Sequence, residues 1–81
     1  MYNAMPGTVR LRVPEILKQR NMNTSEFAKA SKLSFNTASA LARGMYDRIG
    51  LETIARVCDA LQVEPGELFE YTQDPVENRE P

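Results

Sequence analysis

Short polar side chains gather in one stretch of the chain, between a serine and a glycine that are typical of helix ends. Asn36, Thr37 and Ser39 occur there with Ala40 and Arg43. Amide, hydroxyl and guanidinium groups can hydrogen-bond base edges or phosphates, and small side chains let a helix enter the major groove. A helix surface selected only for stability more often carries glutamate and lysine. The stretch therefore favours contact with duplex DNA.

Other reactive groups are few. The chain has no histidine and one cysteine, Cys58, so thiolate or imidazole metal sites and the usual serine or cysteine triads lack their parts. Cys58 falls on an apolar helical stripe, which favours a buried thiol over a redox centre. Glu64, Glu67 and Glu70 recur at helical spacing and indicate a solvated face. We expect no enzyme activity, no metal, no cofactor and no small-molecule ligand.

The net charge of -1 hides an asymmetry between the two parts of the chain. Residues 1–48 carry eight basic and three acidic side chains, a net charge of +5, whereas residues 49–81 carry two basic and eight acidic ones, a net charge of -6. Segregated charge of this kind is the electrostatic footprint of a small nucleic-acid-binding protein. The first part could face phosphates, and the second part should face away from them.

Hydrophobic periodicity predicts an all-α fold, a small bundle of about five helices. Pro14 suits the first turn of the first helix, and Asn23 or Thr24 caps the second, with Glu26 completing a capping box. Ser34 caps the third helix and Gly44 ends it. The helices are expected at about residues 14–20, 24–31, 35–43, 51–61 and, as a short last helix, from 65.

The fourth of these helices has the clearest apolar stripe. Its core face is predicted to consist of residues at amphipathic helical offsets: Leu51, Ile54, Ala55, Cys58 and Leu61.

Residues 8–13 alternate apolar side chains with arginines, which predicts a short half-buried strand. A lone strand leaves its backbone groups without partners. Its partner is either the apolar stretch 68–71 of the same chain or the same strand of a second subunit, and both alternatives stay open.

Three segments are expected along the chain: a flexible leader at 1–7, one folded domain at 8–71, and an acidic flexible tail at 72–81. No apolar run approaches the roughly 20 residues that span a bilayer, and the start of the chain lacks the features of a signal peptide. We expect a cytoplasmic protein that does not contact a membrane.

An extended set of blocks resembles a known family. Residues 23–34, 42–44, 51–55 and 58–68 follow one another in the order typical of lambda-repressor-like helix-turn-helix domains of the Cro and Xre types. The resemblance covers about residues 9–71. It implies five helices, of which the second and third form the DNA-binding motif and the third lies in the major groove.

The resemblance also implies roles for individual positions. The residues implied to face bases are Asn36, Thr37, Ser39 and Ala40. The residues implied to contact the DNA backbone are Thr24, Ser25, Lys32, Arg43 and Arg48.

Several of these positions have a simpler interpretation. Arg43 could pair with Asp47 across the helix end, and Asn36 with Thr37 could be an ordinary solvated helix start. Phe35 could touch a thymine methyl group or seal the corner between the two helices.

The chain departs from the family pattern in places. Lys32 stands in the turn where glycine is common, so it must tolerate a left-handed conformation or adjust the turn. Thr24 replaces a common glutamine, and Ala42 replaces a common glutamate, so we expect a shorter anchor and the loss of a polar bridge.

Two functions follow from these observations. The first is a transcriptional regulator, expected to be a repressor, that binds operator DNA as a homodimer. The alternative is a protein-interaction module, such as an antitoxin or adaptor, that uses the same fold and docks a basic partner on its acidic tail. The dimer surface is either the strand at 8–13 or the face near Val57, Phe69 and Tyr71.

Overall fold

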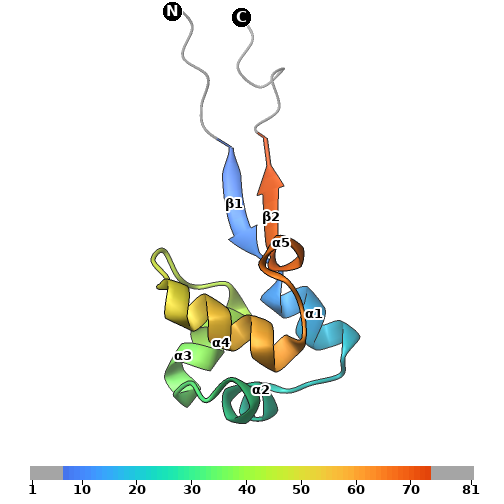
Figure 1. The fold of residues 1–81 in the computed structure, drawn as a ribbon, viewed down its shortest axis with the longest axis vertical. Coiled ribbons are helices and arrows are strands. Elements are labelled where there is room, and N and C mark those ends of the chain that lie inside the picture. Colours follow the sequence, from blue (N-terminus) through green and yellow to red (C-terminus); the bar gives the residue numbers. More distant parts are fainter. Residues whose placement is uncertain (1–6, 74–81) are drawn as a thin grey trace, which may run out of the picture.

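The computed structural model describes residues 7–73, which form five helices and a two-stranded antiparallel sheet (Figure 1). In chain order the elements are β1 (Thr8–Leu11), α1 (Val13–Gln19), α2 (Thr24–Ser31), α3 (Phe35–Arg43), α4 (Leu51–Leu61), α5 (Pro65–Leu68) and β2 (Phe69–Thr72). The predicted all-α fold class is therefore confirmed, and all five expected helices are present. Within these residues no helix has both the length and the apolar character needed to cross a membrane.

The two strands come from opposite ends of the described chain and pair with each other. Thr8 lies opposite Thr72, and Leu11 lies opposite Phe69. This pairing decides between the two partners left open by the sequence, because β1 uses the stretch near residue 70 of its own chain. The predicted strand is two residues too long, since Arg12 is already the N-cap of α1.

The sheet is attached to the helices by polar contacts. The Leu11 amide donates to the Tyr46 hydroxyl at 2.8 Å, and the Arg12 amide donates to the Leu68 carbonyl at 2.7 Å. The Arg10 guanidinium lies between the carboxylates of Glu15 and Glu70. Its hydrogen bond holds the pKa of Glu15 below the ordinary value. The two-stranded sheet of β1 and β2 projects from the bundle at the end opposite α2 and α3 (Figure 1).

The capping predictions are confirmed. Asn23 Oδ1 accepts from the Glu26 amide at 2.8 Å, and Glu26 Oε1 accepts from the Asn23 amide at 2.9 Å, so Asn23 rather than Thr24 is the cap of α2. Ser34 caps α3, and Gly44 ends it in the left-handed conformation. These contacts satisfy amides that a helix start otherwise leaves without partners.

One continuous core joins the helices and the sheet. Its buried members are Leu11, Val13, Ile16, Leu17, Phe27, Ala38, Leu41, Ile54, Val57, Leu61 and Leu68.

The prediction for the buried face of α4 is partly wrong. Ile54 and Leu61 are buried as expected, but the third member of the stripe is Val57, which has no exposed surface. Leu51 is 87% exposed and Ala55 is also exposed, because Leu51 is the first residue of the helix and the buried stripe follows the spacing i, i+3, i+7. Val57 is therefore excluded as an accessible dimer contact.

The leader predicted at 1–7 and the tail predicted at 72–81 lie outside the described residues, except for Gly7, Thr72 and Gln73. The limits of the three segments stay a prediction.

Lys32 ends α2 in the left-handed region, with φ 61° and ψ 29°. Its amide donates to the Lys29 carbonyl at 3.3 Å, and the amide of Leu33 donates to the Ala28 carbonyl at 3.2 Å. This is the conformation in which glycine is the least strained residue. Of the two alternatives that the sequence left open for Lys32, the structure shows the left-handed conformation and not an adjusted turn.

We predict that Lys32→Gly raises the free energy of unfolding by about 0.5–1 kcal/mol, because glycine removes the steric cost of the left-handed conformation. The matched control is Lys29→Gly, which puts the same change inside α2 and should lower that free energy by about 1 kcal/mol. Urea unfolding followed by circular dichroism measures both. Equal destabilisation by the two substitutions would contradict the assignment of strain to Lys32.

Candidate nucleic-acid interface

Two helices joined by a short turn form one end of the molecule. α2 and α3 are separated by Lys32, Leu33 and Ser34 alone. Phe27 of α2 and Ala38 of α3 have no exposed surface, so the corner between the helices belongs to the core. The buried Ser31 hydroxyl donates to the Phe27 carbonyl at 2.7 Å, so this buried polar group has a partner.

The start of α3 is a fixed, solvent-facing array of polar groups. Ser34 Oγ accepts from the Thr37 amide at 3.1 Å and donates to Thr37 Oγ1 at 3.0 Å. The Thr37 hydroxyl is the acceptor of this hydrogen bond, so its own O–H group remains free to donate to a ligand. Asn36 and Thr37 are both exposed. An amide and a hydroxyl therefore stand together in the first turn of the helix.

A groove runs between α3 and the segment that follows it. Its volume is about 390 Å³. Asn36, Thr37 and Ala40 line one side, and Met45 and Arg48 are among the residues of the other side. The structure thus brings three of the four predicted base-facing residues to one groove with one predicted backbone contact. Ser39 is half-buried and does not line this groove.

Phe35 precedes this array as the first residue of α3. It leaves 55% of its surface exposed, so it does not seal the corner between α2 and α3 by being buried there. Its exposed ring lies next to Asn36 in sequence, on the open side of the helix start.

The residues predicted to contact the DNA backbone surround α3. Thr24 is half-buried and Ser25 is exposed at the first turn of α2, and Lys32 in the turn is exposed. Arg43 and Arg48 are exposed as well.

The cations of this set keep their charge unpaired. In residues 7–73 the recorded ion pairs involve Arg10 and Arg56, and neither Lys32, Arg43 nor Arg48 takes part in one. The alternative pairing of Arg43 with Asp47 is therefore not formed in this structure. An exposed cation that is in no ion pair can bind a DNA phosphate without first breaking an ion pair within the protein.

Other arginines of the basic part of the chain are used internally. Arg10 holds two carboxylates, Arg12 donates to the Glu67 carbonyl at 3.0 Å, and Arg20 donates to the Leu61 carbonyl at the end of α4. The charge count of the first part of the chain therefore overstates the basic surface open to a ligand.

Sequence reasoning missed one wall of the groove. Met45, 64% exposed, follows directly after the glycine that ends α3, and Thr53 reaches the groove from α4. Neither residue falls in a periodic pattern. The one available signal was the large apolar side chain of Met45 in the connection between the third and fourth predicted helices.

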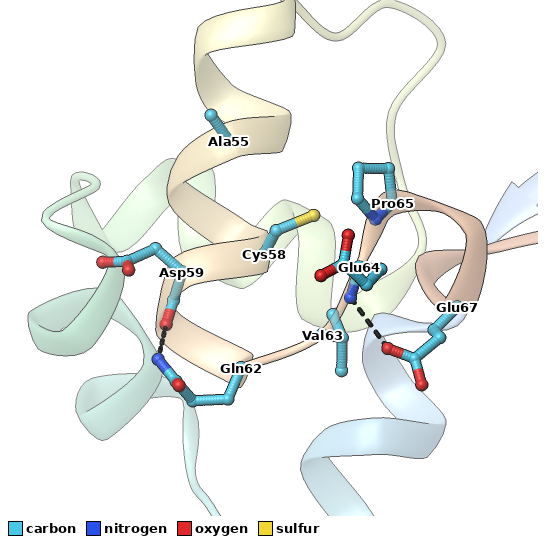
Figure 2. A pocket seen from close by; sticks show the side chains of 8 residues that line it. All are labelled: Ala55, Cys58, Asp59, Gln62, Val63, Glu64, Pro65 and Glu67. Atoms are coloured by element: carbon cyan, nitrogen blue, oxygen red, sulfur yellow. Dashed lines mark hydrogen bonds between the residues drawn. The ribbon is translucent and has the colours of Figure 1, made fainter.

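A second hollow, between α4 and α5, has the opposite character (Figure 2). It has a volume of about 550 Å³ and is lined by Cys58 together with the acidic residues Asp59, Glu64 and Glu67. The Glu67 carboxylate accepts from the Glu64 amide at 2.8 Å. Within the described residues, no group of these side chains converges as a metal site would require. Its carboxylates would repel phosphates, so this hollow is unsuited to contact with a nucleic acid.

Cys58 lies at the edge of this hollow. Desolvation by the surrounding atoms raises the pKa of its thiol, and the nearby Glu64 carboxylate raises it further. A raised pKa keeps the thiol protonated and unreactive near neutral pH. This environment fits the structural role expected for the single cysteine.

The features that define a helix-turn-helix DNA-binding domain are a helix pair joined by a short turn, a capped and exposed second helix, and cations around it that form no ion pair within residues 7–73. The chain belongs to the family of Cro/C1-type HTH DNA-binding domains, which matches residues 12–74.

Individual proteins are similar over most of the chain. The uncharacterized HTH-type transcriptional regulator YozG of Bacillus subtilis is 28% identical over 64 residues, which cover 79% of this chain and 76% of that protein. A crystal structure described as that of a candidate DNA-binding protein from Bacteroides fragilis superposes with a TM-score of 0.65 at 21% identity, covering 78% of this chain and all of that one. The transcriptional regulator VanUg gives a TM-score of 0.61 at 19% identity, covering 91% of this chain and all of that one. These two likenesses concern the fold.

We predict that Ser34→Ala lowers the free energy of unfolding by about 1 kcal/mol, because the Thr37 amide loses its acceptor at the start of α3. Ser34→Asp restores an acceptor and should recover most of the loss. Chemical unfolding measures the stability, and amide exchange at Thr37 measures the local fraying. Unchanged exchange at Thr37 in Ser34→Ala would show that the cap does not order this turn.

We predict that Cys58 reacts with iodoacetamide more slowly in the folded protein than in urea at pH 8.5. Burial raises the thiol pKa, so a smaller fraction is thiolate at that pH. Glu64→Gln removes the second cause and should shift the reactive pH range downward. Glu52→Gln, on the helix α4 that carries Cys58, should not shift it. Mass spectrometry of the alkylated fraction against pH gives the midpoint. A folded midpoint at or below the unfolded one would contradict the raised pKa.

Proposed function

We propose that this chain is a transcriptional regulator that reads a specific duplex DNA sequence with α3 in the major groove. The observation that carries the proposal is the exposed amide and hydroxyl of Asn36 and Thr37 at the start of α3, beside a groove that Arg48 also lines. The proposal is supported by the similarity to YozG, which is described as an HTH-type transcriptional regulator.

The polar groups at the start of α3 match the chemistry of base edges. The Asn36 amide can donate to and accept from the N6 and N7 atoms of an adenine, and the Thr37 hydroxyl can serve either kind of edge. Ala40 adds a methyl group that suits contact with a thymine methyl. Ser39 is the fourth proposed base contact, reached from the neighbouring side of the helix.

Backbone contacts are proposed for the side chains around α3. Thr24 and Ser25 stand at the amino terminus of α2, where free helix amides and hydroxyls bind a phosphate well. Lys32, Arg43 and Arg48 supply charge. These contacts would fix the register of α3 on the duplex and would account for a strong dependence of affinity on salt.

A homodimer on two half-sites is part of the proposal. One small module binds DNA weakly, and linking two modules raises the effective concentration of the second. Occupying an operator excludes other proteins from the same base pairs, so binding alone is enough to repress. We place this activity in the cytoplasm and assign no catalytic step to the chain.

The competing function is the protein-interaction module. The acidic hollow of Asp59, Glu64 and Glu67 favours it, since a basic partner would find three carboxylates there. The acidic tail expected to support this function lies almost entirely outside the described residues. A folded protein that binds no duplex at low salt would favour this alternative.

The test begins with selection of a bound sequence from a pool of random duplexes, followed by fluorescence anisotropy at several salt concentrations. We predict that Asn36→Ala costs about 1–3 kcal/mol of discrimination at one base pair and little on random DNA. Arg43→Ala should weaken binding to every sequence and reduce the salt slope by about 1.

The matched control is Arg56→Ala, which removes the same charge from an arginine already paired with Glu52. It should change affinity much less than Arg43→Ala. Equal effects of the two arginine substitutions would mean that net charge alone drives binding, and specificity unaffected by Asn36→Ala would remove Asn36 from the reading face.

A further inference from the structure

One aromatic side chain on the surface of α3 is not among the proposed DNA contacts. Phe35 is the first residue of α3, directly after the cap Ser34, and 55% of its surface is exposed. A single exposed apolar residue is ordinary on a protein surface, so its position decides whether it has a role.

The position of Phe35 on α3 places it on the face of the proposed base contacts. Residues four apart lie in one row along a helix. Phe35, Ser39 and Arg43 therefore form one row, and Asn36 and Ala40 form the adjacent row. The two buried residues of α3 lie outside both rows. Phe35 is thus the amino-terminal member of the helix face that the core leaves open.

The backbone that carries Phe35 is ordered by hydrogen bonds on either side of it. The Thr37 amide donates to Ser34 Oγ at 3.1 Å, and the Ala38 amide donates to the Ser34 carbonyl at 2.9 Å. An aromatic side chain on an ordered backbone has only two torsion angles left to fix, so it loses little conformational freedom on binding. The Phe35 ring is therefore well suited to a contact that requires a defined position.

The electrostatics of the first turn of α3 allow a polyanion to approach the ring. Among the five helices of residues 7–73, α3 alone has no acidic residue in its first turn. The glutamates in the first turns of the other four are Glu15, Glu26, Glu52 and Glu67. An acidic side chain there would stabilise the positive end of the helix dipole but would repel phosphates. The start of α3 keeps its positive end uncompensated beside Phe35.

The chemistry of phenylalanine limits what it can recognise on a base pair. Its ring offers no conventional hydrogen-bond donor or acceptor to a base edge. Base edges in the major groove present donors and acceptors, and the apolar group among them is the C5 methyl of thymine. A cytosine methylated at C5 carries the same apolar group at the same ring position. Against any other edge, the ring would remove water from polar groups without replacing their hydrogen bonds.

We propose that Phe35 is a specificity-determining residue that contacts the C5 methyl group of a pyrimidine in the major groove. The ligand class is a 5-methylpyrimidine, of which thymine is the common member. The inference deepens the proposed function and rests on it, because it requires α3 to lie in the major groove. The amino-terminal residues of a recognition helix are those that contact base edges, and Phe35 adds an apolar contact beside the hydrogen-bonding groups of Asn36 and Thr37.

The surroundings of Phe35 favour this ligand over a protein partner. Its neighbours Ser34 and Asn36 are polar and exposed, as are Lys32 and Thr37. The centre of a protein interface joins several apolar or aromatic side chains in one desolvated patch. A base methyl group needs only one apolar contact within a polar surface, and that is what the start of α3 provides.

Single replacements of thymine by uracil test the proposal, because uracil lacks only the C5 methyl group. Each thymine of the duplex selected for the wild type is replaced in turn by deoxyuridine, and fluorescence anisotropy at one salt concentration gives the affinity. We expect a position at which the wild type loses about three- to fivefold in affinity, the cost of leaving roughly one methyl group unburied. Phe35→Ala should lose nothing there. A loss at a thymine contacted by Ala40 should persist in Phe35→Ala.

Duplexes with cytosine or 5-methylcytosine at the position so identified separate methyl recognition from recognition of the rest of the base pair. The wild type should bind the methylated duplex about three- to fivefold more tightly. Phe35→Ala should bind both duplexes equally, and Phe35→Leu should keep part of the preference because leucine is apolar. The matched control is Leu51→Ala, which truncates an 87% exposed apolar side chain outside α3. It should keep the full preference.

Circular dichroism and thermal melting show whether each variant is folded. Should Phe35→Ala not fold, Phe35→Gln tests the same contact, because its amide replaces the apolar ring and should lower the methyl preference. A wild type whose affinity no uracil replacement changes overturns the proposal, as does a methyl preference that Phe35→Ala or Phe35→Gln retains in full.

These outcomes are distinguishable from failure of the proposed function. A wild type that binds its selected duplex without regard to C5 methyl groups overturns the role of Phe35 and leaves sequence-specific DNA binding standing. A folded wild type that binds no duplex at low salt overturns the proposed function, and the role of Phe35 with it.

Discussion

The burial of Phe27 in the core is the constraint on which the rest of the structure depends. Neither Phe27 of α2 nor Ala38 of α3, which belongs to the same core, retains any exposed surface. Truncating a fully buried phenylalanine to alanine typically costs about 3–5 kcal/mol, several times the contribution of any single cap in this chain. Core packing therefore fixes the crossing of α2 and α3. Caps such as Ser34 then order the first turn of α3, whose polar side chains face the solvent.

The chain divides its arginines between structure and surface. Arg10, Arg12 and Arg20 tie the β1–β2 sheet and the end of α4 to the bundle. Arg43 and Arg48, beside α3, form no ion pair within the part of the chain that the structure describes. A sum of charges cannot distinguish these uses. The hollow between α4 and α5 is lined by acidic residues, which would repel phosphates. The surface around α3, with its exposed cations, suits phosphates better.

Local signals in the sequence were enough for the helices and their ends. Capping residues act on amides three positions away, so Ser34 could be predicted directly and the cap of α2 was narrowed to Asn23 or Thr24. For Lys32 the sequence left a left-handed conformation and an adjusted turn as alternatives. The buried face of α4 was wrongly extended to Leu51 and Ala55. An apolar stripe in the sequence shows which residues share a helix face, but it does not show how far the neighbouring elements cover that face. The partner of β1 and the Met45 wall of the groove depend on contacts between distant segments, which periodicity does not encode.

The pairing of β1 with β2, two strands separated in sequence by all five helices, has a consequence for the order of folding. Leu11 meets Phe69 across an intervening segment that contains every helix, so closing this loop costs chain entropy that local helix formation does not. The strands can zip together only after the bundle has brought their ends close. During synthesis, the two-stranded sheet is thus assembled last, when most other hydrophobic surface is already covered. An incomplete chain would therefore hold its helices before it could form the sheet.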